Sequence, residues 1–218
     1  AATGTLIIDG EEYTFAADGA LADGLVETDD GLRFAVGSGE GDSSWVTDDF
    51  RTFEGYTYYF NGDGYAVSGW QDIDGNRYYF NGECRLVNGI FERDGSVYYM
   101  SESGMVTEEW VNTDEATYYF LENGEAAEGW TTIDGVEYYF NGDGELQRGW
   151  TEIGGRRYFL ENGVALRGPV YIDGVYYVIS EDGYIKSGWV SWNSRRYYCR
   201  EDGTPYTDTT ITIDGREY

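Results

Sequence analysis

A motif of about 20 residues recurs along the whole chain of 218 residues. Its clearest copy runs over residues 129–150, opens and closes on Gly-Trp, and contains Ile-Asp-Gly followed by Tyr-Tyr-Phe. A repeat this short is one supersecondary unit, which cannot bury a hydrophobic face alone and has to stack on its neighbours. The period therefore predicts an array of stacked repeats in place of one globular core.

The copies follow one another along the chain, most of them at steps of about 20 residues. We therefore expect residues 1–218 to form a single repeat domain. Because the last copy stops at Tyr218 in its middle, we expect the sequence to be a piece of a longer protein or to end on a half-hairpin cap. The repeats start near Thr5, Leu25, Trp45, Trp70, Ile90, Trp110, Trp130, Trp150, Pro169, Trp189 and Thr210.

Each repeat has the signature of a β-hairpin. Two runs of β-forming residues flank a dipeptide such as Asp134-Gly135, which is the strongest short-range hairpin signal. Strand alternation places Tyr138 and Phe140 on one face and Tyr139 on the other, and one of these faces should be core. The prediction is an all-β protein, a β-solenoid of about ten 20-residue β-hairpin repeats.

The charge of the chain excludes several classes of partner. Acidic residues outnumber basic ones 41 to 14, and the net charge is −27. Such a field repels nucleic acid, anionic lipids and anionic wall polymers. The apolar runs are too short for a membrane span, so no membrane insertion is expected. Neutral glycans and cationic groups such as choline remain as partners.

The sequence lacks the side chains that most catalytic and metal sites need. With no histidine, neither a Ser-His nor a Cys-His nucleophile system can be assembled. The carboxylates recur at turn positions, where they shape the backbone, and calcium-loop spacings are absent. Cys84 and Cys199 lie about six repeats apart, so we expect a free thiol and a buried small hydrophobe. We predict no enzyme activity, no catalytic residue, no metal and no cofactor.

The aromatic residues are the candidate ligand-binding groups. Tryptophan and tyrosine rings can form a core, stack on sugar rings or cage quaternary ammonium groups. Repetition favours a binding role for the set, because equivalent weak sites between successive hairpins supply avidity. The candidate residues are Trp70, Tyr78, Trp110, Tyr118, Trp130, Tyr138, Trp150, Tyr158, Tyr176, Trp189 and Tyr198.

With Gly-Trp, Ile-Asp-Gly, Tyr-Tyr-Phe and a glycine turn in register, as over residues 69–82, the sequence resembles the cell-wall-binding repeat superfamily. That superfamily includes choline-binding modules of pneumococcal surface proteins, glucan-binding domains of streptococcal glucosyltransferases and repetitive domains of clostridial toxins. The resemblance covers essentially the whole chain and implies a location that is secreted or on the bacterial cell surface.

In the choline-binding branch, the resemblance implies a cage made from the Trp of Gly-Trp, an aromatic just before Tyr-Tyr, and an aromatic of the next hairpin. The position before Tyr-Tyr is aromatic here only at Tyr176, which leaves one family-like cage of Tyr176, Trp189 and Tyr198. The motif Ile-Asp-Gly-x-x-Tyr-Tyr-Phe is more similar to the glucan-binding and toxin branches.

The leading hypothesis is therefore a non-catalytic carbohydrate-binding and cell-surface-binding module of a secreted bacterial protein. It would stack tyrosine and tryptophan on a neutral glycan or cell-wall polysaccharide at several sites between hairpins. One alternative is a choline-type cell-wall anchor. The other is a structural spacer or receptor-binding arm of a toxin-like protein.

Overall fold

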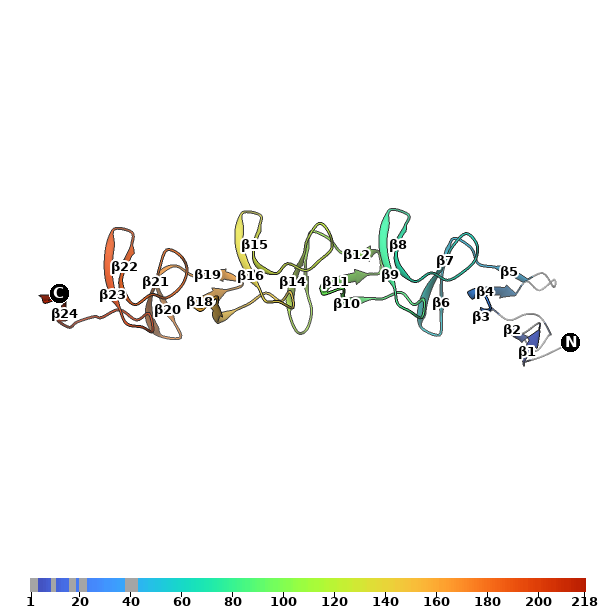
Figure 1. The fold of residues 1–218 in the computed structure, drawn as a ribbon, viewed down its shortest axis with the longest axis horizontal. Coiled ribbons are helices and arrows are strands. Elements are labelled where there is room, and N and C mark those ends of the chain that lie inside the picture. The colour runs from blue at the N-terminus through green and yellow to red at the C-terminus, as the bar shows by residue number, and fades with distance from the viewer. Residues whose placement is uncertain (1–3, 9–10, 16–18, 20–22, 38–42) are drawn as a thin grey trace. The chain divides into compact units, whose positions relative to one another are not determined.

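Every regular element in the described part of the chain is a β-strand (Figure 1). The computed structural model describes residues 4–8, 11–15, 19, 23–37 and 43–218. The chain divides into two compact units, an N-terminal unit (Ala1–Thr107) and a C-terminal unit (Glu108–Tyr218). Both are built from antiparallel hairpins, which confirms the predicted all-β fold of about ten hairpin repeats.

The N-terminal unit contains hairpins that each pair two consecutive strands. A short third strand extends two of them, namely β5 (Ser43–Trp45) beside β4 and β12 (Gly104–Met105) beside β11. The hairpins are β1 (Gly4–Ile8) with β2 (Glu11–Phe15), β3 (Gly24–Thr28) with β4 (Gly31–Gly37), β6 (Asp49–Phe53) with β7 (Tyr56–Phe60), β8 (Gly69–Ile73) with β9 (Asn76–Phe80), and β10 (Gly89–Arg93) with β11 (Ser96–Ser101).

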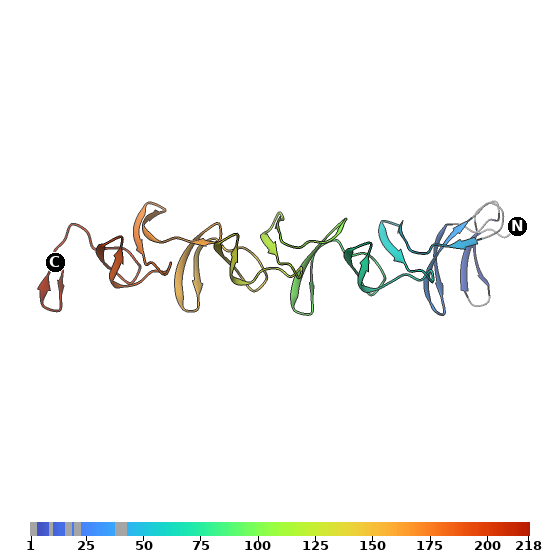
Figure 2. The same cartoon turned by 90° about the horizontal axis from the view of Figure 1, so that it is seen from above.

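The C-terminal unit repeats this pattern, with β19 (Val164–Ala165) as a short third strand beside β18. Consecutive hairpins within a unit point in different directions, as the two views show (Figure 2). The hairpins are β13 (Glu109–Asn112) with β14 (Thr117–Phe120), β15 (Gly129–Ile133) with β16 (Val136–Phe140), β17 (Gly149–Ile153) with β18 (Arg156–Glu161), β20 (Gly168–Ile172) with β21 (Val175–Ile179), β22 (Gly188–Trp192) with β23 (Arg195–Cys199), and β24 (Thr212–Ile213) with β25 (Arg216–Glu217).

The Asp-Gly dipeptides form the hairpin turns. At Asp134 and Gly135 the φ angles are 50° and 79°, and positive φ at both central residues is the geometry of a type I′ turn. This turn matches the twist of the flanking strands and sets the register, in which Gly129 lies opposite Phe140 and Ile133 opposite Val136. The hairpin prediction from Asp-Gly is confirmed here.

The core lies on the strand face that carries the last residue of Tyr-Tyr-Phe. Phe60, Phe80, Phe120 and Phe140 are all fully buried. Other repeats place a different apolar residue at the same position, and these are equally enclosed: Met100, Leu160, Ile179 and Cys199. The sequence left open which face of the strand is core, and the structure assigns it to the Phe140 side.

Several connectors are tied to the hairpin before their own by backbone hydrogen bonds. The amide of Leu146, which follows β16, donates to the carbonyl oxygen of Thr117 on β14 at 2.8 Å. Equivalent bonds occur in other repeats, from Leu86 to Thr57 at 2.7 Å and from Ile185 to Arg157 at 2.9 Å. Stacking therefore rests on hydrogen bonds as well as on buried rings.

One predicted repeat start is corrected by the strand pairing. Trp45 does not open the third hairpin, because it ends β5 and pairs with Ala35 on β4. The hairpin begins at Asp49 instead, and Phe50 lies opposite Tyr59 as Trp70 lies opposite Tyr79. The extra residues of this long repeat are used for a third strand, so the tryptophan spacing was misleading here. The organisation of residues 1–218 as a single domain stays a prediction.

The two cysteines are free thiols. Cys199 is 2 % exposed and belongs to the core, as expected of a small buried hydrophobe. Burial raises the pKa of the Cys199 thiol to about 11, with a smaller contribution from the carboxylate of Asp202. Cys84 is only half-buried, and burial raises the pKa of its thiol too.

Candidate functional site

A tryptophan near the start of a hairpin lies opposite an aromatic ring of the second strand. A two-residue turn places the second residue of the first strand across from the fourth residue of the second strand, as in Trp130 and Tyr139. Their side chains therefore share one face and meet. Ring centroids are 5.0–5.2 Å apart in the pairs Trp70–Tyr79, Trp110–Tyr119, Trp130–Tyr139, Trp150–Phe159 and Trp189–Tyr198.

The following hairpin supplies a third ring to each pair. Its first signature aromatic approaches the tryptophan edge-on or tilted, with centroids 5.0–5.3 Å apart. We call each set an aromatic trio and name it by its tryptophan. The trios are Trp70 with Tyr79 and Tyr98, Trp110 with Tyr119 and Tyr138, Trp130 with Tyr139 and Tyr158, Trp150 with Phe159 and Tyr177, and Trp189 with Tyr198 and Tyr218.

The trios are partly accessible to solvent. Four of the tryptophans are half-buried, and Trp189 is 37 % exposed. This separates the trio face from the opposite face of the same hairpin, where Phe140 is fully buried. A ring that packs on two neighbours while keeping part of its surface in water can serve both stacking and binding.

Cations of this chain gather on its aromatic rings. Nine of the 14 lysine and arginine residues lie over an aromatic ring at 3.8–5.7 Å from its centroid. In three trios the tryptophan itself is covered, by Arg77 at 5.1 Å, Arg157 at 4.3 Å and Arg196 at 4.2 Å. These ring faces therefore attract positive charge in a chain whose net charge is −27.

The Trp110 and Trp130 trios differ, because no cation covers either indole in the described part of the chain. The position that holds an arginine in the covered trios is Thr117 in the first and Glu137 in the second. Glu137 lies opposite Thr132, two positions along the strands from the Trp130–Tyr139 pair, and has an exposed ion pair with Arg167 at 3.9 Å.

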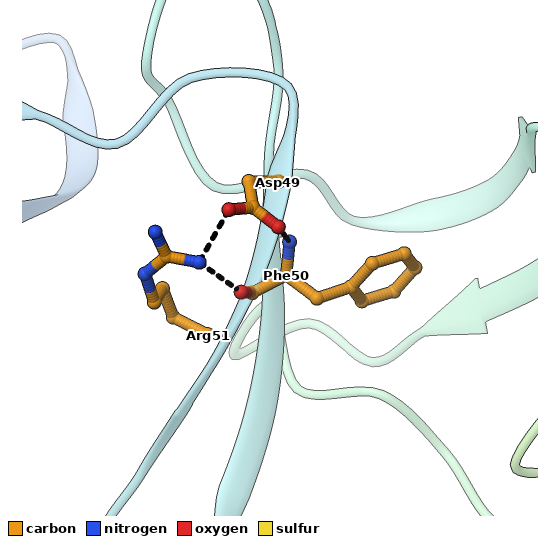
Figure 3. A network of polar contacts seen from close by, with 3 residues as sticks. All are labelled: Asp49, Phe50 and Arg51. Carbon is orange, nitrogen blue, oxygen red and sulfur yellow. Dashed lines mark hydrogen bonds and ion pairs between the residues drawn. The ribbon is translucent and has the colours of Figure 1, made fainter.

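A third uncovered ring set lies in the N-terminal unit, where phenylalanine replaces tryptophan. Phe50 contacts Tyr59 at 4.9 Å and Tyr78 of the next hairpin at 5.3 Å. Asp49 and Arg51 pair with each other around the backbone of Phe50, and the ring extends away from them (Figure 3). Burial, and then the carboxylates of Asp48, Asp74 and Asp49, raise the pKa of Tyr59.

The structure brings together only some of the residues predicted as site residues. Trp110 meets Tyr138, Trp130 meets Tyr158, and Trp189 meets Tyr198, while Trp70 and Trp150 meet other rings. Tyr78 contacts Phe50 of the preceding hairpin. Tyr118 is buried beside Phe120. Tyr176 stacks with Tyr171 at 4.9 Å and takes no part in the ring contacts of Trp189.

The rings directly opposite four of the five trio tryptophans were not among the predicted site residues, whereas Tyr198, opposite Trp189, was. The missed residues could have been found, because a two-residue turn fixes cross-strand partners by simple counting. The contribution of the next hairpin could not be counted in this way, since it depends on how two hairpins pack. The missed rings are Tyr79, Tyr119, Tyr139, Phe159, Tyr98, Tyr177 and Tyr218.

Carboxylate and thiolate side chains are common metal ligands in proteins. Within the described residues, no group of three or more such side chains is placed to hold a metal ion. A search of the same residues for a helix long and apolar enough to cross a membrane finds none.

Two family models match the chain. The choline-binding repeat matches residues 67–110 and 127–168, and the putative cell wall binding repeat matches residues 108–126. The matched segments contain the Trp70, Trp110, Trp130 and Trp150 residues. No curated protein sequence matches the chain.

Solved structures from Streptococcus pneumoniae share this fold. The structure of CbpJ from strain TIGR4 aligns with a TM-score of 0.70 and 21 % identity, over 99 % of this chain and 91 % of that one. Choline binding protein F in the presence of a peptidoglycan analogue, a tetrasaccharide-pentapeptide, gives a TM-score of 0.66 and 24 % identity over 99 % and 90 %. The choline-binding domain of CbpL gives 0.57 and 21 % over 96 % and 100 %. At these identities the likeness is one of fold.

Proposed function

Because residues 67–168 belong to the choline-binding and cell-wall-binding repeat family, we propose that this chain is a non-catalytic module that attaches to the bacterial cell-wall surface by binding choline. The ligand group is the quaternary ammonium of choline, and the sites are aromatic trios between successive hairpins. This reading replaces neutral glycan as the leading ligand.

The observation that carries the proposal is the placement of cations over the trio rings. Arg157 over Trp150 and Arg196 over Trp189 hold a positive group at 4.3 Å and 4.2 Å from the ring centroid. A trimethylammonium group is attracted to the same ring face by the same quadrupole. The trios are thus chemically suited to a cation.

The register of the hairpins removes the objection drawn from the sequence. A cage built with the residue before Tyr-Tyr would fail at Glu137, which is not aromatic. In the Trp130 trio the second ring comes from Tyr139 and the third from Tyr158, so three rings are present without it. Glu137, on the same strand face, puts no positive charge over the indole, and its carboxylate pairs with Arg167.

The electrostatics of the whole chain favour the same ligand. A net charge of −27 raises the local concentration of small cations and gives nothing to a neutral sugar. Several shallow sites of one kind along a repeat array also suit a wall polymer that presents the same cationic group many times.

The proposal is tested by thermal unfolding with choline, using 3,3-dimethylbutan-1-ol as a neutral isostere of the same shape. Choline at about 100 times its Kd should stabilise the fold by about 2.7 kcal/mol per site, and the isostere should stabilise it far less. Trp130→Ala should lose part of this effect, and Trp130→Phe, which keeps a ring, should weaken it without disturbing the fold. Equal stabilisation by the two compounds, or none by choline, would rule the proposal out.

A neutral glycan remains a second candidate at one place only. Tyr171 is 71 % exposed and stacks with Tyr176 in the hairpin whose tryptophan position is Pro169. An exposed ring of this kind suits sugar stacking. On a glycan array, binding that disappears in Tyr171→Ala but is untouched by choline would support this candidate, and an array without any signal would remove it.

A further inference from the structure

The arginines that cover three tryptophans occupy one equivalent position in their hairpins. Arg77, Arg157 and Arg196 each lie two residues before the ring opposite the tryptophan. Residues at this spacing share the strand face of the tryptophan and are its diagonal neighbours, within reach of a long side chain. The contact is therefore built into the hairpin and does not depend on a neighbouring repeat.

Covering the ring places a guanidinium where an external cation would have to sit. The distances of 4.2–5.1 Å from guanidinium carbon to ring centroid lie within the range of cation–π contact. A guanidinium and a trimethylammonium group cannot occupy one ring face together. An internal cation on a tether also has a high effective concentration, so a free ligand competes poorly.

The two uncovered tryptophans carry residues at this position that cannot compete. Thr117 is neutral and short, and its hydroxyl donates a hydrogen bond to the side-chain oxygen of Asn112 on the facing strand at 2.8 Å. Glu137 is negative. The nearest connector arginines are directed to these residues and not to the indoles, with Arg148 at 3.4 Å from the Thr117 hydroxyl and Arg167 at 3.9 Å from the Glu137 carboxylate.

We infer that Arg77, Arg157 and Arg196 act as built-in occupants that close the Trp70, Trp150 and Trp189 trios to quaternary ammonium ligands. Among the tryptophan trios, only those of Trp110 and Trp130 are then free to bind a quaternary ammonium ligand. The inference rests on the proposed choline function and adds which sites are used and what determines the choice.

The open sites lie on the two sides of one hairpin. The β15–β16 hairpin contributes Tyr138 to the Trp110 trio, and Tyr139 with Trp130 to the other. The Phe50 ring set is also uncovered, but phenylalanine has a weaker ring face for cations than tryptophan has. Strong sites should therefore be a neighbouring pair in the C-terminal unit.

The inference is tested by following each tryptophan indole in ¹⁵N NMR spectra during titration with choline, and in parallel with tetramethylammonium. In the native chain the Trp110 and Trp130 indoles should shift and the Trp150 indole should not. Arg157→Thr, which copies the residue of the Trp110 hairpin, should strengthen binding at Trp150 by about tenfold or more. The reciprocal change Glu137→Arg should abolish the response of Trp130.

Two matched controls separate charge from position. Arg156→Thr removes the same charge from the adjacent residue, whose guanidinium lies over Tyr184 on the other strand face, and should leave Trp150 silent. Glu137→Gln removes the carboxylate without adding a cation and should keep most of the Trp130 response. A Trp150 indole that stays silent in Arg157→Thr, or that already responds in the native chain as strongly as Trp130, overturns the inference.

The failure of this inference can be told apart from failure of the proposed function. If no indole of the native chain responds to choline, the proposed function fails, while a response of Trp150 appearing in Arg157→Thr would still support the occupant role. If Trp130 responds in the native chain but opening Arg157 adds nothing, the function stands and the occupant role is wrong.

Discussion

The packing of one connector on the previous one predicts a sharp difference between two glycine substitutions. Gly144 lies in the connector after β16 with φ +77°, and a Cβ added there would be 2.6 Å from the Cβ of Ala126 in the preceding connector. Ala126 is 6 % exposed and its Cβ is fixed by the backbone, so it cannot rotate away. Gly149 has a nearly identical φ of +75°, but a Cβ there meets nothing within 4 Å.

Both substitutions place an alanine in left-handed backbone, but only Gly144→Ala also creates a steric clash. An alanine in left-handed backbone costs about 1–2 kcal/mol at either position. Gly144→Ala adds overpacking between adjacent repeats, which typically costs about 1–3 kcal/mol. We expect Gly144→Ala to destabilise by about 2–5 kcal/mol and Gly149→Ala by about 1–2 kcal/mol.

The assay is urea and thermal unfolding followed by near-ultraviolet circular dichroism. For a domain of roughly 100 residues, each kcal/mol lowers Tm by about 4–8 °C, so the two variants should differ by at least about 4 °C. Amide exchange of Leu146, whose N–H bonds the Thr117 carbonyl of the previous hairpin, should accelerate in Gly144→Ala and stay close to native in Gly149→Ala. Equal losses of stability in the two variants would refute close packing between these connectors.

Two further predictions concern titratable groups. The side chain of Cys199 is buried and the pKa of its thiol is raised to about 11, so Cys199 should resist iodoacetamide at about pH 8 until the chain unfolds. Cys84 is only half-buried and should be labelled first. Mass mapping that finds Cys199 labelled as fast as Cys84 contradicts this prediction. The hydroxyl and the amide of Thr204 donate hydrogen bonds to the Asp202 carboxylate at 2.6 and 2.9 Å, and these bonds lower the pKa of Asp202 in the folded chain. The ionised carboxylate therefore stabilises the fold above the usual Asp pKa of about 3.9, and this stabilisation is lost as the pH falls through the lower pKa of the folded state. Asp202→Asn should accordingly lose less stability than the native chain between about pH 5 and pH 2.5, and identical pH profiles would contradict the assignment.

Much of each hairpin could be predicted from the sequence because its determinants are local. Asp134-Gly135 takes up positive φ at both residues, and this alone sets the register that pairs Trp130 with Tyr139. Alternation then separates the Phe140 face from the Tyr139 face. The same counting applied to the long third repeat fails at Trp45, because an inserted strand, β5, pairs with β4 and shifts the hairpin start to Asp49.

Only part of the candidate site could be predicted, because the third ring of each trio comes from the next hairpin. The family resemblance and the aromatic set were evident in the chain, and the family is confirmed over residues 67–168. The position before Tyr-Tyr led toward neutral glycan, because the cage was expected to need an aromatic residue there and only Tyr176 supplies one. The structure instead supplies the ring from Tyr139 and places Arg157 and its equivalents directly over tryptophan.

The sequence by itself determined the period, the hairpins, their turns and which residues share a strand face, since all of these follow from spacings of a few residues. Only the tertiary structure decided which ring of the next hairpin completes a trio. Tyr158 reaches Trp130 across 28 residues of chain because the connector bonds, such as Leu146 to Thr117, set the turn from one hairpin to the next. That turn depends on backbone contacts between repeats, which no spacing within a single repeat encodes.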